Sequence, residues 1–153
     1  MSKPPKLFVD RTIEVNAPAA RVWAVLTERQ MTDIWTKEFS SGGPKFHIES
    51  GWRLGSDVLW KADDGKVLVE GKVTAFEPNK LLRFTVFDTR SSRPAVTIED
   101  GITFTLEKGK TTELRVKHGD FSVLPEGRKY RDMSAMIWDK VLPEIKALAE
   151  RRE

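Results

Sequence analysis

The C-terminal segment, from about Glu126 to Arg151, constrains most strongly how this chain can fold. Placed on an α-helix, its apolar side chains form one continuous stripe made of Tyr130, Met133, Ile137, Val141, Ile145 and Leu148. Polar residues lie on the opposite side, namely Asp132, Asp139, Lys146 and Glu150. Such a helix is stable mainly through the packing of its apolar stripe against another layer. Pro143 lies inside the segment, and we hypothesise that it bends the helix to follow a concave surface.

The preceding residues supply that second layer, because their apolar positions recur at every second residue. The strand pattern covers residues 7–15, 46–49, 57–62, 67–76, 81–87, 96–106 and 112–118. Tight turns such as Asp63-Asp64-Gly65-Lys66 join neighbouring strands, so the sheet is predicted to be antiparallel. Two short helices are predicted after the first strand, one over residues 18–26 and one that follows Thr27 and carries Trp35. The prediction is a single α+β domain over residues 1–153.

The sheet of this domain has more apolar surface than one helix can cover. Strand alternation predicts which apolar side chains face the interior. They include Val58, Trp60, Ala62, Val67, Val69, Val73, Ala75, Leu82, Phe84, Val86, Ile102, Phe104, Leu106, Leu114 and Val116. A helix about 10 Å wide cannot seal a sheet of seven strands. We therefore expect the curved sheet to wrap around the C-terminal helix and to leave a mostly apolar cavity between them.

The residues predicted to line this cavity and bind a ligand come from all parts of the fold. They are Trp60, Phe84, Phe104 and His118 on strands, Trp35, Phe39, Trp52 and Phe121 around the opening, and Tyr130, Met133, Ser134 and Ile137 on the last helix. A few polar groups in an apolar cleft orient a small molecule. The alternative is that the aromatic rings only fill the core, that His118 is a satisfied core histidine, and that Ser134 bonds to its own helix backbone.

Composition excludes several other classes of function. There are no cysteines, and the two histidines, His47 and His118, have no second ligand at metal spacing, so we predict no metal and no cofactor. The formal net charge is +3, with bases and acids interleaved, which argues against nucleic acid as a partner. No apolar leader or membrane-length apolar stretch occurs, so a cytoplasmic protein without a membrane span is expected.

Several short motifs give the chain a family resemblance. They are Asn16-Ala17-Pro18 with Val22-Trp23, then Trp35, Phe76-Glu77-Pro78, His118-Gly119-Asp120-Phe121 and Met136-Ile137-Trp138. In this order they resemble the START-like, polyketide-cyclase (SRPBCC) superfamily. The closer resemblance is to the family named after the C-terminal domain of the activator of heat-shock-protein-90 ATPase. It implies a helix-grip fold, with seven antiparallel strands, two short helices after the first strand and the long helix last.

Two departures from the family pattern bear on function. The family commonly has a glycine where this chain has Ile137, so we expect a narrower cavity. The eukaryotic activators also carry a separate N-terminal domain, which is absent from this sequence and so counts against chaperone stimulation.

The function predicted from these observations is the binding of a small hydrophobic or amphipathic molecule, such as a lipid, a polyketide or an aromatic metabolite. Two alternatives are a cochaperone-like stress-response protein and a cyclase- or hydrolase-type enzyme that uses the same cavity. Acid–base catalysis would need a partner that orients His118, and the sequence identifies none, so the catalytic residues are unknown and binding is favoured. The sequence does not decide whether the chain forms a homo-oligomer through an edge strand.

Overall fold

The computed structural model describes residues 6–40, 46–85, 87–88, 101–123 and 126–151. Its helices are α1 (Ala19–Thr27), α2 (Arg29–Trp35) and α3 (Gly127–Glu150), with two 3-10 turns, η1 (Thr36–Ser40) and η2 (Phe121–Val123). Its strands are β1 (Val9–Val15), β2 (Phe46–Ser50), β3 (Asp57–Ala62), β4 (Val67–Glu77), β5 (Leu81–Thr85), β6 (Phe87–Asp88), β7 (Gly101–Lys108) and β8 (Thr112–Gly119). In this described part, no helix is both long and apolar enough to cross a membrane.

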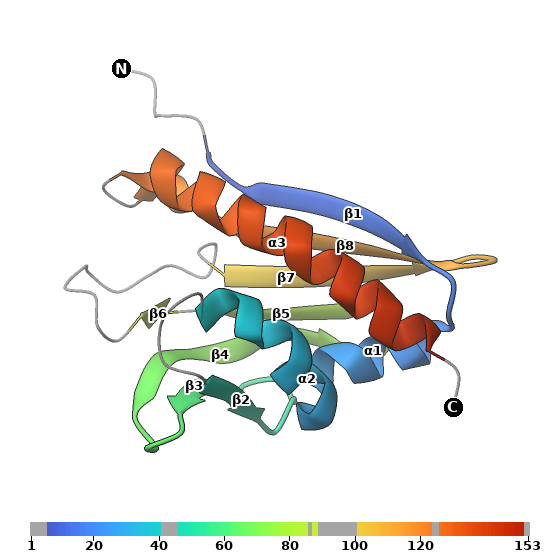
Figure 1. The fold of residues 1–153 in the computed structure, drawn as a ribbon, viewed down its shortest axis with the longest axis horizontal. Helices are drawn as coiled ribbons and strands as arrows, with labels where there is room; N and C mark the ends of the chain where they lie inside the picture. Colours follow the sequence, from blue (N-terminus) through green and yellow to red (C-terminus); the bar gives the residue numbers. More distant parts are fainter. Residues whose placement is uncertain (1–5, 41–45, 86, 89–100, 124–125, 152–153) are drawn as a thin grey trace.

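The strands form one curved sheet in the order β1-β8-β7-β5-β4-β3-β2 (Figure 1). All of the pairings between described strands are antiparallel. The predicted α+β helix-grip fold is therefore confirmed, including the two short helices after the first strand. The segment predicted as one strand over residues 81–87 is divided into β5 and β6, which pair with different parts of β4: β5 with Val73–Glu77 and β6 with Val69 and Glu70.

The helices share one face of the sheet, as Figure 1 shows. The long α3 crosses this face and packs against β1 and α1, while α2 packs against β2. The helix continues through Pro143, whose ring lies on its exposed side. The other face of the sheet carries no helix among the described elements.

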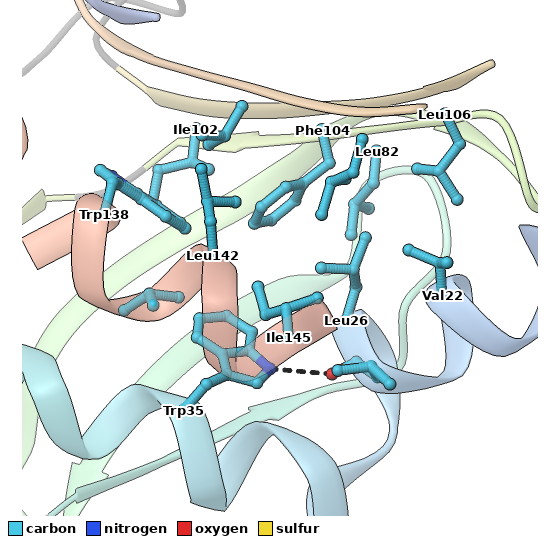
Figure 2. Close-up of a cluster of buried hydrophobic side chains, with 14 of the residues drawn as sticks. Val22, Leu26, Trp35, Leu82, Ile102, Phe104, Leu106, Trp138, Leu142 and Ile145 are labelled. Carbon is cyan, nitrogen blue, oxygen red and sulfur yellow. Dashed lines mark hydrogen bonds between the residues drawn. The ribbon is translucent and has the colours of Figure 1, made fainter. Parts of the chain in front are cut away.

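The core forms between α3 and the central strands (Figure 2). The inward positions predicted on these strands are buried, namely Leu82, Phe84, Ile102, Phe104, Leu106, Leu114 and Val116, whereas Val86 lies outside the described residues. Leu26 of α1 and Leu142 and Ile145 of α3 complete the packing from the helical side of the sheet. Strand alternation thus identified the apolar face of the central sheet correctly.

Strand β4 departs from simple alternation at two β-bulges. Its register with β5 shifts between Val73 and Ala75, so Phe76 faces the buried Leu82 and contacts the ring of Trp23 at 5.5 Å. The prediction that Ala75 points inward is wrong, because one extra residue in a strand reverses the faces that follow it. A second shift, near the start of β4, buries Leu68 in place of the predicted Val67.

The buried face of α3 also differs from the predicted stripe. Its members are Ala135, Trp138, Val141, Leu142, Ile145, Leu148 and Ala149. Tyr130 and Met133, expected to face the interior, are 42% and 51% exposed. The physical reason is Trp138, whose large ring turns toward the sheet and donates a hydrogen bond from Nε1 to Nδ1 of His118 at 3.2 Å. This contact sets the rotation of the helix and leaves its first turns outside the core.

Replacing the most central ring tests this packing. Phe104→Ala is expected to lower the free energy of unfolding by about 3–5 kcal/mol, because a fully buried ring leaves a cavity that its neighbours fill only partly. Phe104 is 1% exposed and contacts both Trp35 and Trp138. Urea denaturation measures the loss. Met136→Ala, at a side chain that is 66% exposed, is the control and is expected to change stability by less than about 0.5 kcal/mol. Equal effects of the two variants would contradict this packing.

Candidate functional site

A connected row of aromatic rings runs through the interior. Trp52, in the loop between β2 and β3, meets Phe84 edge-on with ring centroids 5.7 Å apart. Phe84 lies 6.3 Å from Phe104, and Phe104 meets Trp138 edge-on at 5.6 Å. Separations of this size are favourable for aromatic pairs. The row thus joins three predicted site residues, Trp52, Phe84 and Phe104, and ends at Trp138, which was not among the predicted site residues.

Two of the predicted tryptophans are core residues. Trp35 was expected at the cavity opening, but it is 2% exposed, and its Nε1 donates a hydrogen bond to the carbonyl of Val25 at 2.9 Å (Figure 2). Its ring packs against Phe104 and Trp138. Trp60 of β3 is likewise buried. The placement of Trp35 at the opening is therefore wrong, because its indole N–H finds a partner on α1 and its ring fills the interior.

The aromatic rings beneath α3 occupy the space in which a cavity was predicted. Figure 2 shows Trp35, Phe104 and Trp138 directed toward one another, with Leu142 and Ile145 of α3 against them. Dense packing of this kind leaves little room for a ligand. Two hollows of the described chain lie elsewhere, one beside Trp52 and one on the outer face of the sheet.

His118, at the end of β8, has a defined structural role. Its Nδ1 accepts the hydrogen bond from Trp138, so the neutral ring carries its proton on Nε2. The ring of Phe121 lies 4.9 Å from its centroid, and Phe121 is itself buried rather than at an opening. One ring nitrogen is therefore satisfied, as in the alternative weighed from the sequence, but His118 is half-buried at the margin of the core. Both partners of this hydrogen bond lie in motifs that the sequence analysis singled out, but a sequence motif does not predict that Trp138 contacts His118.

Asp120 completes the motif that starts at His118. Its Oδ1 accepts hydrogen bonds from the backbone N–H groups of Leu7 and Ser122, both at 2.8 Å. Burial alone raises the pKa of this carboxyl, but the hydrogen bonds from Leu7 and Ser122 outweigh burial and hold the pKa below its ordinary value. Asp120 therefore ties the start of β1 to η2, and with it the end of the sheet to the turn before α3. The role is structural, and sequence analysis did not predict it.

The first half of α3 extends past the filled core. Tyr130, Met133 and Met136 are exposed there, so the first two do not line an interior cavity. Ser134 is half-buried, and Ile137 is half-buried and packs against the core cluster. The side chain of Phe39, another predicted lining residue, lies outside the described residues. The four predicted lining residues on this part of α3 therefore differ in burial. Ser134 and Ile137 are half-buried, whereas Tyr130 and Met133 are exposed.

The hollow beside Trp52 has a volume of about 650 Å³ and lies between the corner of α1 and α2 and the β2–β3 hairpin. It is lined by Thr27, Arg29, Ile48, Glu49, Ser50, Gly51, Trp52, Ser56, Asp57 and Leu59. Among the predicted ligand-binding residues whose side chains the structure describes, Trp52 is the one found in this lining. The other described members of the set lie deeper or on other elements, and periodicity cannot identify a hollow built from a helix corner and a loop.

A pair of carboxyl groups lies where α3 passes η1. Burial raises the pKa of Glu144, and the neighbouring Glu38 carboxyl raises it further. Glu144 therefore keeps its proton to a higher pH than an ordinary glutamate. Within the described part of the chain, no group of three or more His, Asp or Glu side chains is placed to hold a metal ion.

Comparison with known proteins gives the family. Residues 16–150 match the family model described as "Activator of Hsp90 ATPase homolog 1-like protein". The chain belongs to this family. No curated protein sequence matches it. The predicted resemblance is therefore confirmed at the level of the family.

Solved structures similar to this family member share its fold. Protein MLL2253 from Mesorhizobium loti is 24% identical with a TM-score of 0.75, over 95% of this chain and 98% of that one. The Aha1 dimer from Colwellia psychrerythraea is 19% identical with a TM-score of 0.69, over 94% and 96%. DynU16, from the dynemicin biosynthetic locus, is 19% identical with a TM-score of 0.68, over 95% of this chain and 48% of that one. At these identities the likeness establishes the helix-grip fold alone.

The carboxylate of Asp120 provides a test of the electrostatics. Asp120→Asn is expected to lower the free energy of unfolding at pH 7 by about 0.5–1.5 kcal/mol, because the side-chain oxygen still accepts both hydrogen bonds but no longer carries the charge that strengthens them. The folded-state pKa is depressed, so the contribution is complete above the ordinary value of 3.8 and disappears as the pH falls through the folded value. Urea denaturation measures the stability difference between wild type and Asp120→Asn at pH 7 and its disappearance at low pH. Asp63→Asn, at an exposed turn, is the control. A difference between wild type and Asp120→Asn that stays constant with pH would contradict the assignment.

Proposed function

We propose that this protein binds a small hydrophobic or amphipathic molecule and that the ligand enters at the hollow beside Trp52. The observation that carries the proposal is the aromatic row, which ends at the half-buried ring of Trp52 inside a hollow of about 650 Å³. Small-molecule sites typically have volumes of ~300–1,000 Å³ and combine apolar walls with a few polar groups. The size of the hollow and the half-buried aromatic ring together favour a metabolite over a macromolecule.

The lining of the hollow matches a molecule with one apolar and one polar part. Trp52, Ile48 and Leu59 supply apolar surface, while Arg29 and Asp57 place charges of both signs at the rim. Arg29 lies 3.7 Å from Asp33, in an exposed ion pair that contributes little to stability and can exchange for a ligand. The apolar part of the ligand would therefore lie against the indole ring and its polar part against the rim.

Binding is favoured over catalysis for a physical reason. Nδ1 of His118 is engaged by Trp138, and its ring is packed against Phe121, so the only candidate acid–base residue from the sequence is held inside a structural cluster. The origin of DynU16 in a biosynthetic locus supports a metabolite as the ligand class. A cyclase- or hydrolase-type activity would need catalytic groups beside Trp52 rather than at His118.

Removal of the Trp52 ring tests the proposed entry point. With the neutral fluorophore Nile red as the probe, Trp52→Ala is expected to weaken binding by about tenfold, because burying an aromatic ring against the probe contributes roughly 1.5–3 kcal/mol. Fluorescence titration measures the dissociation constant. Trp23→Ala is the matched control, since Trp23 is also half-buried but packs against Phe76 elsewhere. Unchanged affinity of Trp52→Ala, or an equal loss in Trp23→Ala, would reject the site.

A second candidate function is interaction with heat-shock protein 90, which the description of the family favours. The test is a pulldown together with an ATPase assay of the chaperone. Association and faster ATP turnover are expected if the chain acts as an activator, and unchanged turnover rejects this role. The homo-oligomer stays a prediction, supported by the dimer described for the Colwellia structure.

A further inference from the structure

The outer face of the sheet, opposite the helices, contains a second hollow of about 400 Å³. It is lined by Lys6, Phe8, Arg83, Gly101, Thr103, Thr105, Arg115, Lys117 and Gly119. Four of these residues are basic and none is acidic. Like charges gathered on one sheet face repel one another, so such a face is stabilised by an anion that neutralises them.

Strand register explains why the bases meet. Arg83 of β5 is opposite Thr103 of β7, and Thr103 is opposite Lys117 of β8. One strand spacing is about 4.8 Å, so Arg83 and Lys117 lie about 10 Å apart at their backbones, with the Thr103 hydroxyl between them. In the adjacent row, Thr105 is opposite Arg115. Cations therefore lie on two sides of the hollow, and threonine hydroxyls lie between them.

The cations differ in how far their charge is already compensated. Arg115 donates two hydrogen bonds to the Asp10 carboxylate, at 2.9 and 2.6 Å. In contrast, Arg83 donates from Nε to the neutral hydroxyl of Thr74 at 3.0 Å, and Lys117 lies over the ring of Phe8 at 4.4 Å. In the described ranges, neither Arg83 nor Lys117 has an ion pair. Lys117 is opposite Asp10 in the β1–β8 register and helps to lower the pKa of that carboxyl, but Asp10 accepts its side-chain hydrogen bonds from Arg115. Arg83 and Lys117 are therefore the cations of the hollow that hold no carboxylate in an ion pair.

Two glycines of the lining allow neighbouring backbones to approach closely at one end of the hollow. Gly101 and Gly119 are opposite each other in the β7–β8 ladder. A Cβ at Gly101 would lie 2.5 Å from the carbonyl oxygen of Phe84, and one at Gly119 would lie 2.6 Å from that of Leu7. No side chain can therefore project there. The ring of Phe8 flanks the same end and offers an apolar contact to an organic group.

We propose that this hollow binds a small organic molecule through a phosphate or sulfate group. The oxyanion lies between Arg83 and Lys117 and accepts a hydrogen bond from Thr103, while Phe8 contacts the organic part. Charge-assisted hydrogen bonds from two cations are the strongest polar contacts that a surface can offer such a group. The site is on the opposite face of the sheet from the core, and it does not depend on binding at Trp52.

The test is an NMR titration of ¹⁵N-labelled protein with four probes: phenyl phosphate, phenyl sulfate, inorganic phosphate and inorganic sulfate. Phenyl phosphate or phenyl sulfate is expected to shift the amide signals of Thr103, Thr105 and Lys117 and to bind more tightly than the matching inorganic ion. Lys117→Gln and Arg83→Gln are each expected to weaken this binding by about tenfold, because each removes one charged contact. Lys140→Gln, on the exposed side of α3, is the control and is expected to have no effect.

Three results would overturn the proposal. An equal affinity for inorganic phosphate and phenyl phosphate would reject an organic ligand at Phe8. An equal loss in Lys140→Gln and Lys117→Gln would show attraction by net charge alone. Binding of poly-glutamate to this face without binding of either phenyl probe would assign it to an acidic protein segment. Unchanged circular dichroism of the two site variants ensures that a loss of binding is not a loss of fold.

Discussion

The contact between α3 and the end of β8 determines how the rest of the molecule is arranged. Trp138 is completely buried, donates its N–H to His118 and packs against Trp35 and Phe104. Because a buried indole N–H needs a partner, this hydrogen bond fixes the rotation of the helix about its axis. The rotation in turn decides which side chains of α3 enter the core and which, such as Met133, remain in solvent.

The same contact has a consequence for ligand binding. A helix-grip fold can leave a cavity beneath its long helix, but here the rings of Trp35, Phe104 and Trp138 occupy that space (Figure 2). Half-buried Ile137 adds to the packing. The aromatic interior therefore reaches solvent at its edge, at Trp52, rather than enclosing a large central volume. A ligand bound beside Trp52 would displace fewer core side chains than a ligand bound beneath α3.

The two faces of the sheet have separate chemistry because alternate residues of one strand point in opposite directions. On β7, Phe104 enters the core while Thr103 and Thr105 reach the basic outer hollow. On β8, Val116 is buried while Lys117 faces outward. One set of strands thus supports an apolar interior and an anion-attracting exterior, and a substitution on one face leaves the other largely intact.

The sequence alone determined the class of fold, the order of its elements and the buried face of the central strands, because alternation and helical spacing are local properties of the chain. The core positions of Phe84 and Phe104 followed from this spacing. Tertiary structure alone decided the rest. The bulge at Thr74 turned Phe76 inward, the bond to His118 rotated α3, and strand register brought Arg83 beside Thr103 and Lys117. Each of these depends on contacts between residues far apart in the chain, and spacing along one segment does not encode them.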